Sequence, residues 1–242
     1  MLKAAKAKHV VQRNVVPLWP VPFAIAATLV VAAHLAWWLS LRDGHVPSCV
    51  PYIEGCVSIS RAARHGLGNH VFRLLMLPCA LLVALHWWTS ARWLRADTAS
   101  GGQGGVVTAL GMVGAVALAV YSTFLGSDGE AYRFLRRYGV IVFFGCSYLA
   151  QLVFLRSARR AQRLDGGLAA AMLAVCVAML ALGVGNTAMT AVVTDAALKD
   201  RIENTLEWHL GVLLVAWFAL QAVLWRRSGY GVDLMLRPPH NP

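Results

Sequence analysis

The sequence predicts an all-α fold, a polytopic membrane protein built as a six-helix transmembrane bundle with both termini cytoplasmic. Three observations lead to this prediction: six long apolar stretches, a composition low in charge, and basic residues concentrated in alternate connections. Hydrophobic residues make up 58% of the 242 positions and charged residues 14%, whereas a soluble domain carries about 25% charged residues. A soluble protein with unusually apolar helices is therefore the weaker interpretation.

Each apolar stretch is long enough to cross the hydrocarbon core of a bilayer, which takes roughly 20 mostly apolar residues. The expected spans cover residues 18–41, 70–93, 105–126, 137–156, 167–190 and 205–225. The third and fifth spans are rich in small residues, among them Gly111, Gly114, Gly183 and Gly185. Small residues allow helix backbones to approach closely, so we expect tight helix packing along these two spans.

The basic residues predict the orientation of the bundle. With the amino terminus inside, the cytoplasmic segments contain thirteen basic residues, namely Lys3, Lys6, Lys8, Arg13, Arg92, Arg95, Arg156, Arg159, Arg160, Arg163, Arg226, Arg227 and Arg237, against three acidic ones, Asp97, Asp165 and Asp233. An excess of Lys and Arg marks the cytoplasmic side. The net charge of +11 follows from this rule and from the anionic inner leaflet. No nucleic-acid partner is expected, because no stripe of basic and aromatic residues lies outside the membrane flanks.

The chain divides into a cytoplasmic segment over 1–17, a membrane domain over 18–226 and a cytoplasmic tail over 227–242. The tail is expected to be disordered because it ends in a proline-rich stretch. The first span follows basic residues, as a signal peptide does, but it is longer than a typical signal peptide, so we expect it to be retained. The longest connection, over 42–69, lies outside. Composition rich in Ala, Leu and Arg indicates a bacterial source, hence the bacterial inner membrane as the location.

Two of the five cysteines lie in the outside loop. Cys49 and Cys56 could form a disulfide in an oxidising compartment, although the geometry of the loop could still forbid it. Cys79, Cys146 and Cys176 lie within spans and are most simply small apolar residues.

Several ionisable or polar side chains fall within spans, at the level of the outer leaflet. Because such groups are costly there, each is a candidate for function. The candidates for one shared polar pocket are Arg73, Tyr121, Arg136, Glu207, His209 and His34. Arginine binds phosphate and carboxylate groups in a bidentate manner, so the expected partner is an anionic membrane lipid. The alternative is a set of local ion pairs, for example Glu130 with Arg133, and Glu207 with Arg73.

Two other functions remain open. A lipid hydrolase or acyltransferase could use Ser58 or Ser60 with a nearby base, although the chain has neither GxSxG nor HExxH, and His65 and His70 form a weak metal pair. A haem-bearing electron carrier could use His34 and His209 as axial ligands. We predict no metal or other cofactor, and the sequence leaves open whether the protein is an enzyme and what its oligomeric state is.

Four stretches carry a resemblance to a known family. They read Cys49-Val-Pro-Tyr-Ile-Glu-Gly-Cys-Val-Ser-Ile-Ser-Arg-Ala-Ala with Asn69-His70-Val-Phe-Arg73, Tyr121-Ser-Thr-Phe-Leu-Gly-Ser-Asp-Gly-Glu, Gly139-Val-Ile-Val-Phe-Phe, and Asn204-Thr-Leu-Glu207-Trp208. In order and spacing they resemble the Frag/DRAM/Sfk membrane family, also described as the Cwh-type amino-terminal domain, and are most similar to its branch of GPI-anchor lipid-remodelling factors. The resemblance implies binding, sorting or remodelling of outer-leaflet lipids. The chain departs from the family at Arg136, where a histidine is usual, and it has no acidic residue within the third span. Since a bacterium lacks GPI anchors, the family's substrate is not transferred to this chain.

Overall fold

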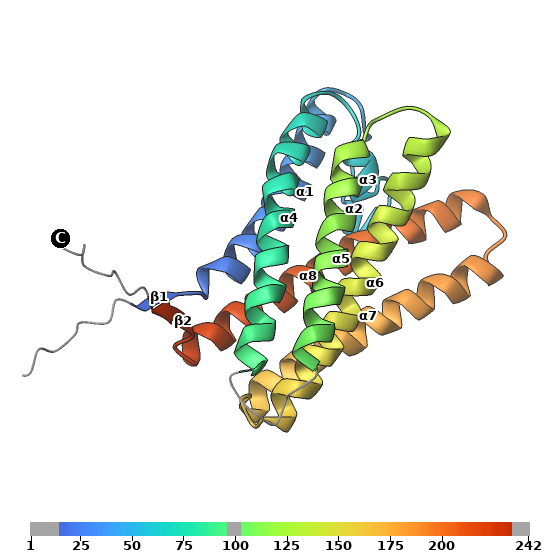
Figure 1. Cartoon of the computed structure of the whole chain (residues 1–242). Helices are drawn as coiled ribbons and strands as arrows, with labels where there is room; N and C mark the ends of the chain where they lie inside the picture. The colour runs from blue at the N-terminus through green and yellow to red at the C-terminus, as the bar shows by residue number, and fades with distance from the viewer. Residues whose placement is uncertain (1–14, 96–102, 234–242) are drawn as a thin grey trace, which may run out of the picture.

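The computed structural model describes residues 15–95 and 103–233, and nearly all of them are helical (Figure 1). The long helices are α1 (Pro20–Arg42), α4 (Gly66–Arg95), α5 (Gln103–Phe124), α6 (Glu130–Arg160), α7 (Gly166–Val192) and α8 (Ala196–Arg227). All six are long and apolar enough to cross a membrane. The structure therefore confirms the all-α fold class with six candidate spans, which fits a multi-pass membrane protein. The cytoplasmic orientation of the termini stays a prediction from the charges.

Several helices extend beyond the apolar stretch that predicts them. Helix α8 begins at Ala196, nine residues before the expected span, because the Asp195 side chain caps it and accepts hydrogen bonds from the backbone N–H groups of Ala197 at 2.8 Å and Leu198 at 3.3 Å. Helix α6 likewise begins at Glu130. Hydropathy marks the part of a helix that lies in hydrocarbon, whereas capping and propensity decide where the helix ends.

The long helices form a ring around a shared interior. Helix α5 packs between α4 and α6, α1 packs between α4 and α8, and α7 packs mainly on α8. In Figure 1 the hairpin of α7 and α8 leans away from α6 toward its turn. The contact between α6 and α7 is correspondingly small, and α6 and α8 share little direct contact. The ring is therefore tight around α4 and α5 and loose beside α7.

Small residues serve the two glycine-rich helices differently. In α5, a Cβ added to Gly111 would lie 2.2 Å from the Cβ of Trp87 in α4, so only glycine fits this contact. The same test at Gly183 and Gly185 of α7 finds no atom within 4 Å. The expected close packing is thus present at Gly111 and absent at the two glycines of α7. Composition could not separate these cases, because a small residue permits close packing without supplying a partner.

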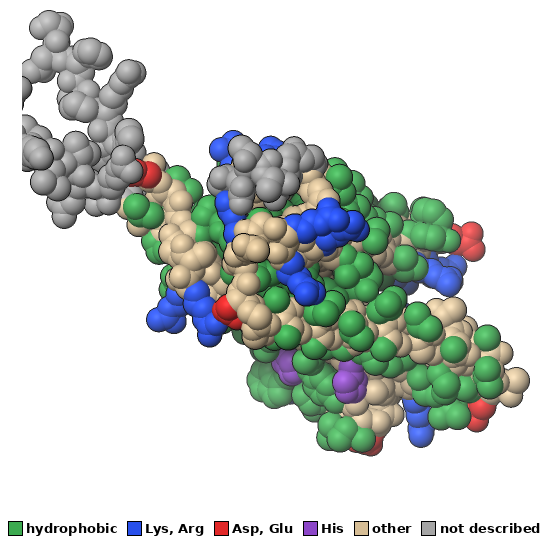
Figure 2. All heavy atoms as spheres, turned by 90° about the horizontal axis from the view of Figure 1, so that it is seen from below, with side chains coloured by type: hydrophobic (Ala, Val, Ile, Leu, Met, Phe, Trp, Pro, Cys, Tyr) green, Lys and Arg blue, Asp and Glu red, His purple; other side chains and the backbone are tan. Residues whose placement is uncertain are grey.

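Basic side chains gather at one end of the bundle, the end seen from below in Figure 2. The last turns of three helices supply many of them, namely Arg92 and Arg95 of α4, Arg159 and Arg160 of α6, and Arg226 and Arg227 of α8. Arg227 pairs with Asp165 at 3.0 Å. This end corresponds to the predicted cytoplasmic side. Other basic residues in that prediction, Lys3, Lys6, Lys8, Arg13 and Arg237, lie outside the described residues.

The first and last described segments of the chain pair with each other beside the bundle. Strand β1 (Val15–Pro17) pairs with strand β2 (Gly231–Asp233) in an antiparallel ladder, and the Tyr230 hydroxyl donates a hydrogen bond to the Thr89 carbonyl at 2.9 Å. Disorder from residue 227 onward stays a prediction, and within that range the structure places Gly231–Asp233 in strand β2. This pairing joins segments more than 200 residues apart, and nothing local in the sequence indicates it. Residues 234–242 lie outside the described residues.

Candidate ligand-binding site

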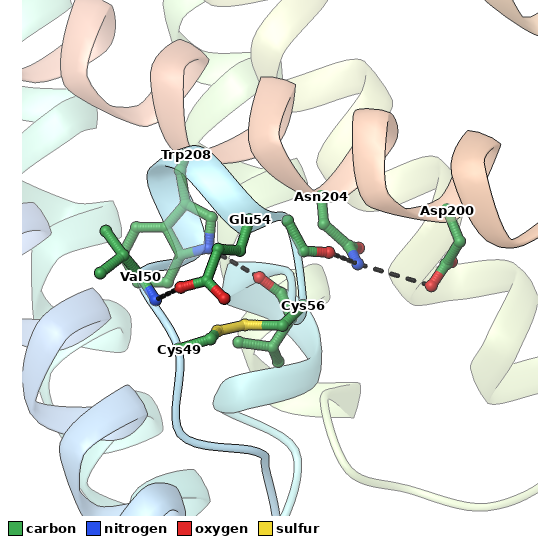
Figure 3. Close-up of a disulfide and its surroundings, with 9 residues drawn as sticks. Cys49, Val50, Glu54, Cys56, Asp200, Asn204 and Trp208 are labelled. Atoms are coloured by element: carbon green, nitrogen blue, oxygen red, sulfur yellow. Dashed lines mark hydrogen bonds between the residues drawn. A yellow bond between two sulfur atoms is a disulfide. The ribbon is translucent and has the colours of Figure 1, made fainter.

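The loop between α1 and α4, which the charges predict to lie outside, folds into a compact cap, residues 43–65, over one end of the bundle. It contains two short helices, α2 (Pro51–Glu54) and α3 (Ile59–Ala62). Two side chains of α8 hold it down: Asn204 donates through Nδ2 to the Gly55 carbonyl at 2.8 Å, and Trp208 donates through Nε1 to the Val57 carbonyl at 2.9 Å (Figure 3). These bonds satisfy backbone carbonyls that would otherwise be buried without partners. The cap is thus part of the helix bundle.

A disulfide and a tight turn shape the middle of the cap. Cys49 and Cys56 are joined by a disulfide, with their Cα atoms 6.5 Å apart, and Figure 3 shows it beside Glu54. Glu54 accepts a hydrogen bond from the backbone N–H of Val50 at 2.6 Å. Gly55 follows the last residue of α2 and has a φ of 60°, in the left-handed region. A Cβ there would lie 2.0 Å from the Arg201 carbonyl oxygen. Glycine is therefore required for the cap to reach α8.

We expect the double variant Cys49→Ser and Cys56→Ser to loosen the cap by about 2 kcal/mol, since the bond closes a short loop. Hydrogen exchange of the purified protein should accelerate over 44–65 and change little in α4 and α5. Cys146→Ser, which removes a free cysteine, is the matched control. Unchanged exchange in the cap would show that the α8 contacts alone hold it.

Glu207 of α8 is bound by the cap and not by an arginine. Its Oε1 accepts a hydrogen bond from the backbone N–H of Ser60 at 3.0 Å, and its Oε2 lies 3.5 Å from the Ser60 hydroxyl. Ser58 caps α3 by accepting from the Arg61 N–H at 3.2 Å. The expected ion pair of Glu207 with Arg73 is wrong, because Ser60 occupies the place of the partner. The cap brings Ser60 there although 147 positions separate it from Glu207.

A charged contact that the sequence did not reveal joins the cap to the first turns of α8. Arg61 donates to both carboxylate oxygens of Asp200, one of them at 2.6 Å from Nη1. This hydrogen bonding, opposed by partial burial, raises the pKa of Arg61. Both side chains are nearly half exposed, so the pair contributes modestly to stability. Of the expected local ion pairs, Glu130 with Arg133 is present at 3.5 Å and is well exposed.

Beneath the cap lies a cavity of about 220 Å³. Its walls come from α1, α4, α5, α6, α8 and the cap, and they include His34, Tyr52, Phe72, Met76, Tyr121, Val140, Phe143, Phe144, Glu207, Trp208, Gly211 and Val215. The few polar groups lie at the cap end. On α8, Glu207 is outermost and Val215 lies eight residues deeper, a distance of about 12 Å at 1.5 Å per residue. The cavity is therefore polar at its outer end and apolar below.

The structure brings together three of the six candidate side chains. His34, Tyr121 and Glu207 all line the cavity. Arg136 donates to the Ser127 carbonyl at 2.9 Å and lies in a shallow surface hollow at the outer end of α6. His209 is exposed and donates to the Thr205 carbonyl at 2.9 Å. Arg73 of α4 lies outside the cavity lining.

The cavity also contains aromatic residues that the sequence assigned to packing or did not single out. The centroid of the Trp208 ring lies 5.0 Å from that of Tyr52 and 5.5 Å from that of His34. His34 Nδ1 donates to the Val30 carbonyl at 2.8 Å, so its Nε2 accepts from the Tyr52 hydroxyl at 2.9 Å. Burial raises the pKa of Tyr52. Since both ring nitrogens of His34 are engaged, axial ligation of a haem would require the Tyr52 bond to break.

The hydrolase hypothesis lacks a catalytic arrangement in the described part of the chain. Ser58 and Ser60 lie with their hydroxyl oxygens 3.1 Å apart, and Ser60 contacts the Glu207 carboxylate. The nearby His65 instead packs on the His45 ring, at 5.5 Å between centroids. A nucleophile hydrogen-bonded to a histidine base is the usual signature of acyl transfer, and residues 15–95 and 103–233 show none at these serines. The same residues contain no cluster of three metal-ligating side chains.

Comparison with known proteins adds no relative to this picture. No family model, curated protein or solved structure matches this chain. The cavity, the cap and their chemistry are therefore the only guides to function among the described residues.

Proposed function

We propose that this integral membrane protein binds membrane lipids, with part of an acyl chain in the cavity beneath the cap and the head group at its outer end. The observation that carries the proposal is the polarity of the cavity: Glu207 and Tyr121 lie at the cap end, and Met76 and Val215 lie among the apolar walls below. This gradient matches an amphiphile standing upright in one leaflet. About 220 Å³ is less than the 300–1,000 Å³ of pockets that enclose drug-sized ligands, so only a segment of one chain enters.

The lipid would reach the cavity sideways from the bilayer. A groove lies between α6, α7 and α8, lined by small residues such as Gly145 and Gly183. Phe144 lines both this groove and the cavity. Because α6 and α8 share little direct contact, we propose that a chain passes between the two spaces at Phe144. A loose α7 beside Phe144 would allow a chain to pass.

The outer arginines favour a lipid that carries a phosphate. Arg133, Arg136 and Arg137 line the hollow at the outer end of α6, and Arg136 lies four residues, about one helical turn, outward from Val140 in the cavity wall. Arg64 adds a guanidinium whose buried Nε has no hydrogen-bond partner among the described residues. Burial and the charge of Arg136 lower the pKa of Arg64. An anionic phosphate near this rim would relieve that repulsion.

The family resemblance supports the same function. Its stretches meet at one place: the Ser60 stretch contacts the Glu207 stretch, while Tyr121 and Val140 line the same cavity. We propose on this basis that the chain belongs with the Frag/DRAM/Sfk proteins and sorts or remodels outer-leaflet lipids, in the bacterial inner membrane. A lipid hydrolase or acyltransferase remains the rival, with the serines of the cap as its nucleophiles.

Filling the cavity is expected to abolish lipid retention. Gly211 lines the cavity, and a Cβ there would lie 3.2 Å from the Ile59 side chain, so Gly211→Leu would place an isobutyl group where the acyl chain is proposed to lie. We expect native mass spectrometry of the purified variant to show at least a tenfold loss of retained phospholipid, equivalent to about 1.4 kcal/mol.

Gly185→Leu is the control, because no atom lies within 4 Å of a Cβ at Gly185. The control should retain lipid as the unmodified protein does. Equal retention by Gly211→Leu, with unchanged thermal stability, would refute the cavity as the lipid site.

A further inference from the structure

The Glu207 carboxylate faces the cavity without a cationic partner. It is half-buried, lines the cavity wall and receives its hydrogen bonds from Ser60. No ion pair joins Glu207 to a Lys, Arg or His nitrogen of the described residues, and the guanidinium charges of Arg61 and Arg64 act on it only from beyond ion-pair distance. A carboxylate at membrane depth is costly unless it is paired, protonated or hydrated. Glu207 therefore has the charge and position to be the counter-ion of a bound group.

The walls beside Glu207 are aromatic. Tyr52, Tyr121 and Trp208 line the same end of the cavity. The Tyr52 and Trp208 rings are 5.0 Å apart, and the Phe72 ring lies 6.3 Å from that of Tyr121. Faces of Tyr and Trp rings attract ammonium groups, and walls of such rings are the usual means of binding substituted ammonium ions. An anion would find no donor from an arginine or lysine on this wall.

We propose that the cavity selects lipids whose head group carries a protonated amine, and that this ammonium binds Glu207 between Tyr52, Tyr121 and Trp208. The inference rests on the proposed lipid-binding function and specifies its ligand class. It also divides a zwitterionic head group between two places. The ammonium lies at Glu207 inside the cavity, and the phosphate lies toward the arginines at the rim.

The test compares lipids that share one acyl chain and differ in the head group. Lysophosphatidylethanolamine has a phosphate and an amine, lysophosphatidylglycerol has the phosphate alone, and monoacylglycerol has neither. The three are presented as an equimolar mixture to the full chain in detergent, and bound species are counted by native mass spectrometry. We expect the amine-bearing lipid to be retained roughly tenfold over lysophosphatidylglycerol, a ratio within the range of one desolvated cation–π or ionic contact.

Glu207→Gln tests the role of the carboxylate, because glutamine keeps the shape of the side chain and can still accept the Ser60 N–H bond. The preference for the amine should fall below about twofold, while the variant still retains all three lipids. Glu203→Gln is the matched control: it removes the same charge one turn earlier on α8, and Glu203 lies outside the cavity lining. It should keep the full preference.

The outcomes separate the two proposals. Equal retention of the three lipids, or a preference that survives Glu207→Gln, would overturn the amine inference and leave the lipid site standing. No retention of any of the three lipids by the unmodified protein would overturn both.

Discussion

Replacing Gly55 with alanine is expected to detach the cap from α8. Two effects add. Gly55 has a φ of 60°, which costs an L-residue about 1–2 kcal/mol, and the new Cβ would lie 2.0 Å from the Arg201 carbonyl oxygen, an overpacking that costs about 1–3 kcal/mol. The clash is with backbone, so no side-chain rotation relieves it. The bonds of Asn204 and Trp208 to the cap should weaken together with it.

Gly44→Ala is the matched control for this variant. Gly44 has a similar φ of 72°, but no atom lies within 4 Å of a Cβ there. It should lose only the conformational contribution of about 1–2 kcal/mol. Thermal unfolding of both purified variants, with hydrogen exchange over 44–65, measures the difference. Equal losses would mean that the cap can shift away from α8 without penalty, which would undermine the site built on Ser60 and Glu207.

Gly111→Ala is expected to separate α4 from α5. The added Cβ would lie 2.2 Å from the Cβ of Trp87, and the Trp87 ring is fully buried and packs edge-on to His86 at 4.9 Å. Because the clash is with the Cβ of Trp87, a change of side-chain rotamer cannot relieve it, and the helices must part. We expect a loss of about 1–3 kcal/mol or more in the free energy of unfolding, measured by thermal or denaturant unfolding in detergent.

Gly105→Ala, on the same helix α5, is expected to change stability in the opposite direction. No atom lies within 4 Å of a Cβ at Gly105, and alanine favours a helix over glycine by up to about 1 kcal/mol. The control should therefore unfold at the same temperature as the parent chain or slightly higher. Tolerance of Gly111→Ala would show that α4 and α5 are not held at the distance described above.

Much of the fold follows from the sequence because hydrocarbon imposes one demand on every span. Each must bury its backbone hydrogen bonds within itself, so each apolar stretch of sufficient length becomes a helix. The stretches over 18–41 and 137–156 were found in this way and correspond to α1 and α6. Hydropathy predicts less well where the chain leaves the hydrocarbon. The start of α8 depends on its N-terminal cap, and the strand at Gly231–Asp233 depends on pairing with a distant segment.

The candidate site was predictable only in part. Hydropathy singled out Glu207, Tyr121 and His34, because polar groups at membrane depth are rare enough to be conspicuous. It also singled out Arg73 and Arg136, which lie outside the cavity lining; Arg136 shares a face of α6 with Val140 but lies one turn beyond the cavity. Depth follows from position in a span, whereas the direction of a side chain depends on the rotation of its helix within the bundle.

The sequence by itself determined that this chain forms six apolar helices. It also placed two cysteines in the loop after the first helix, and acidic and aromatic residues near one end of the spans. Only the tertiary structure decided which of these groups meet. Ser60 reaches Glu207 across 147 positions because Asn204 and Trp208 fasten the cap to α8. Such contacts depend on packing between distant segments, and their stability comes from burial and hydrogen bonds that exist only once the helices have assembled.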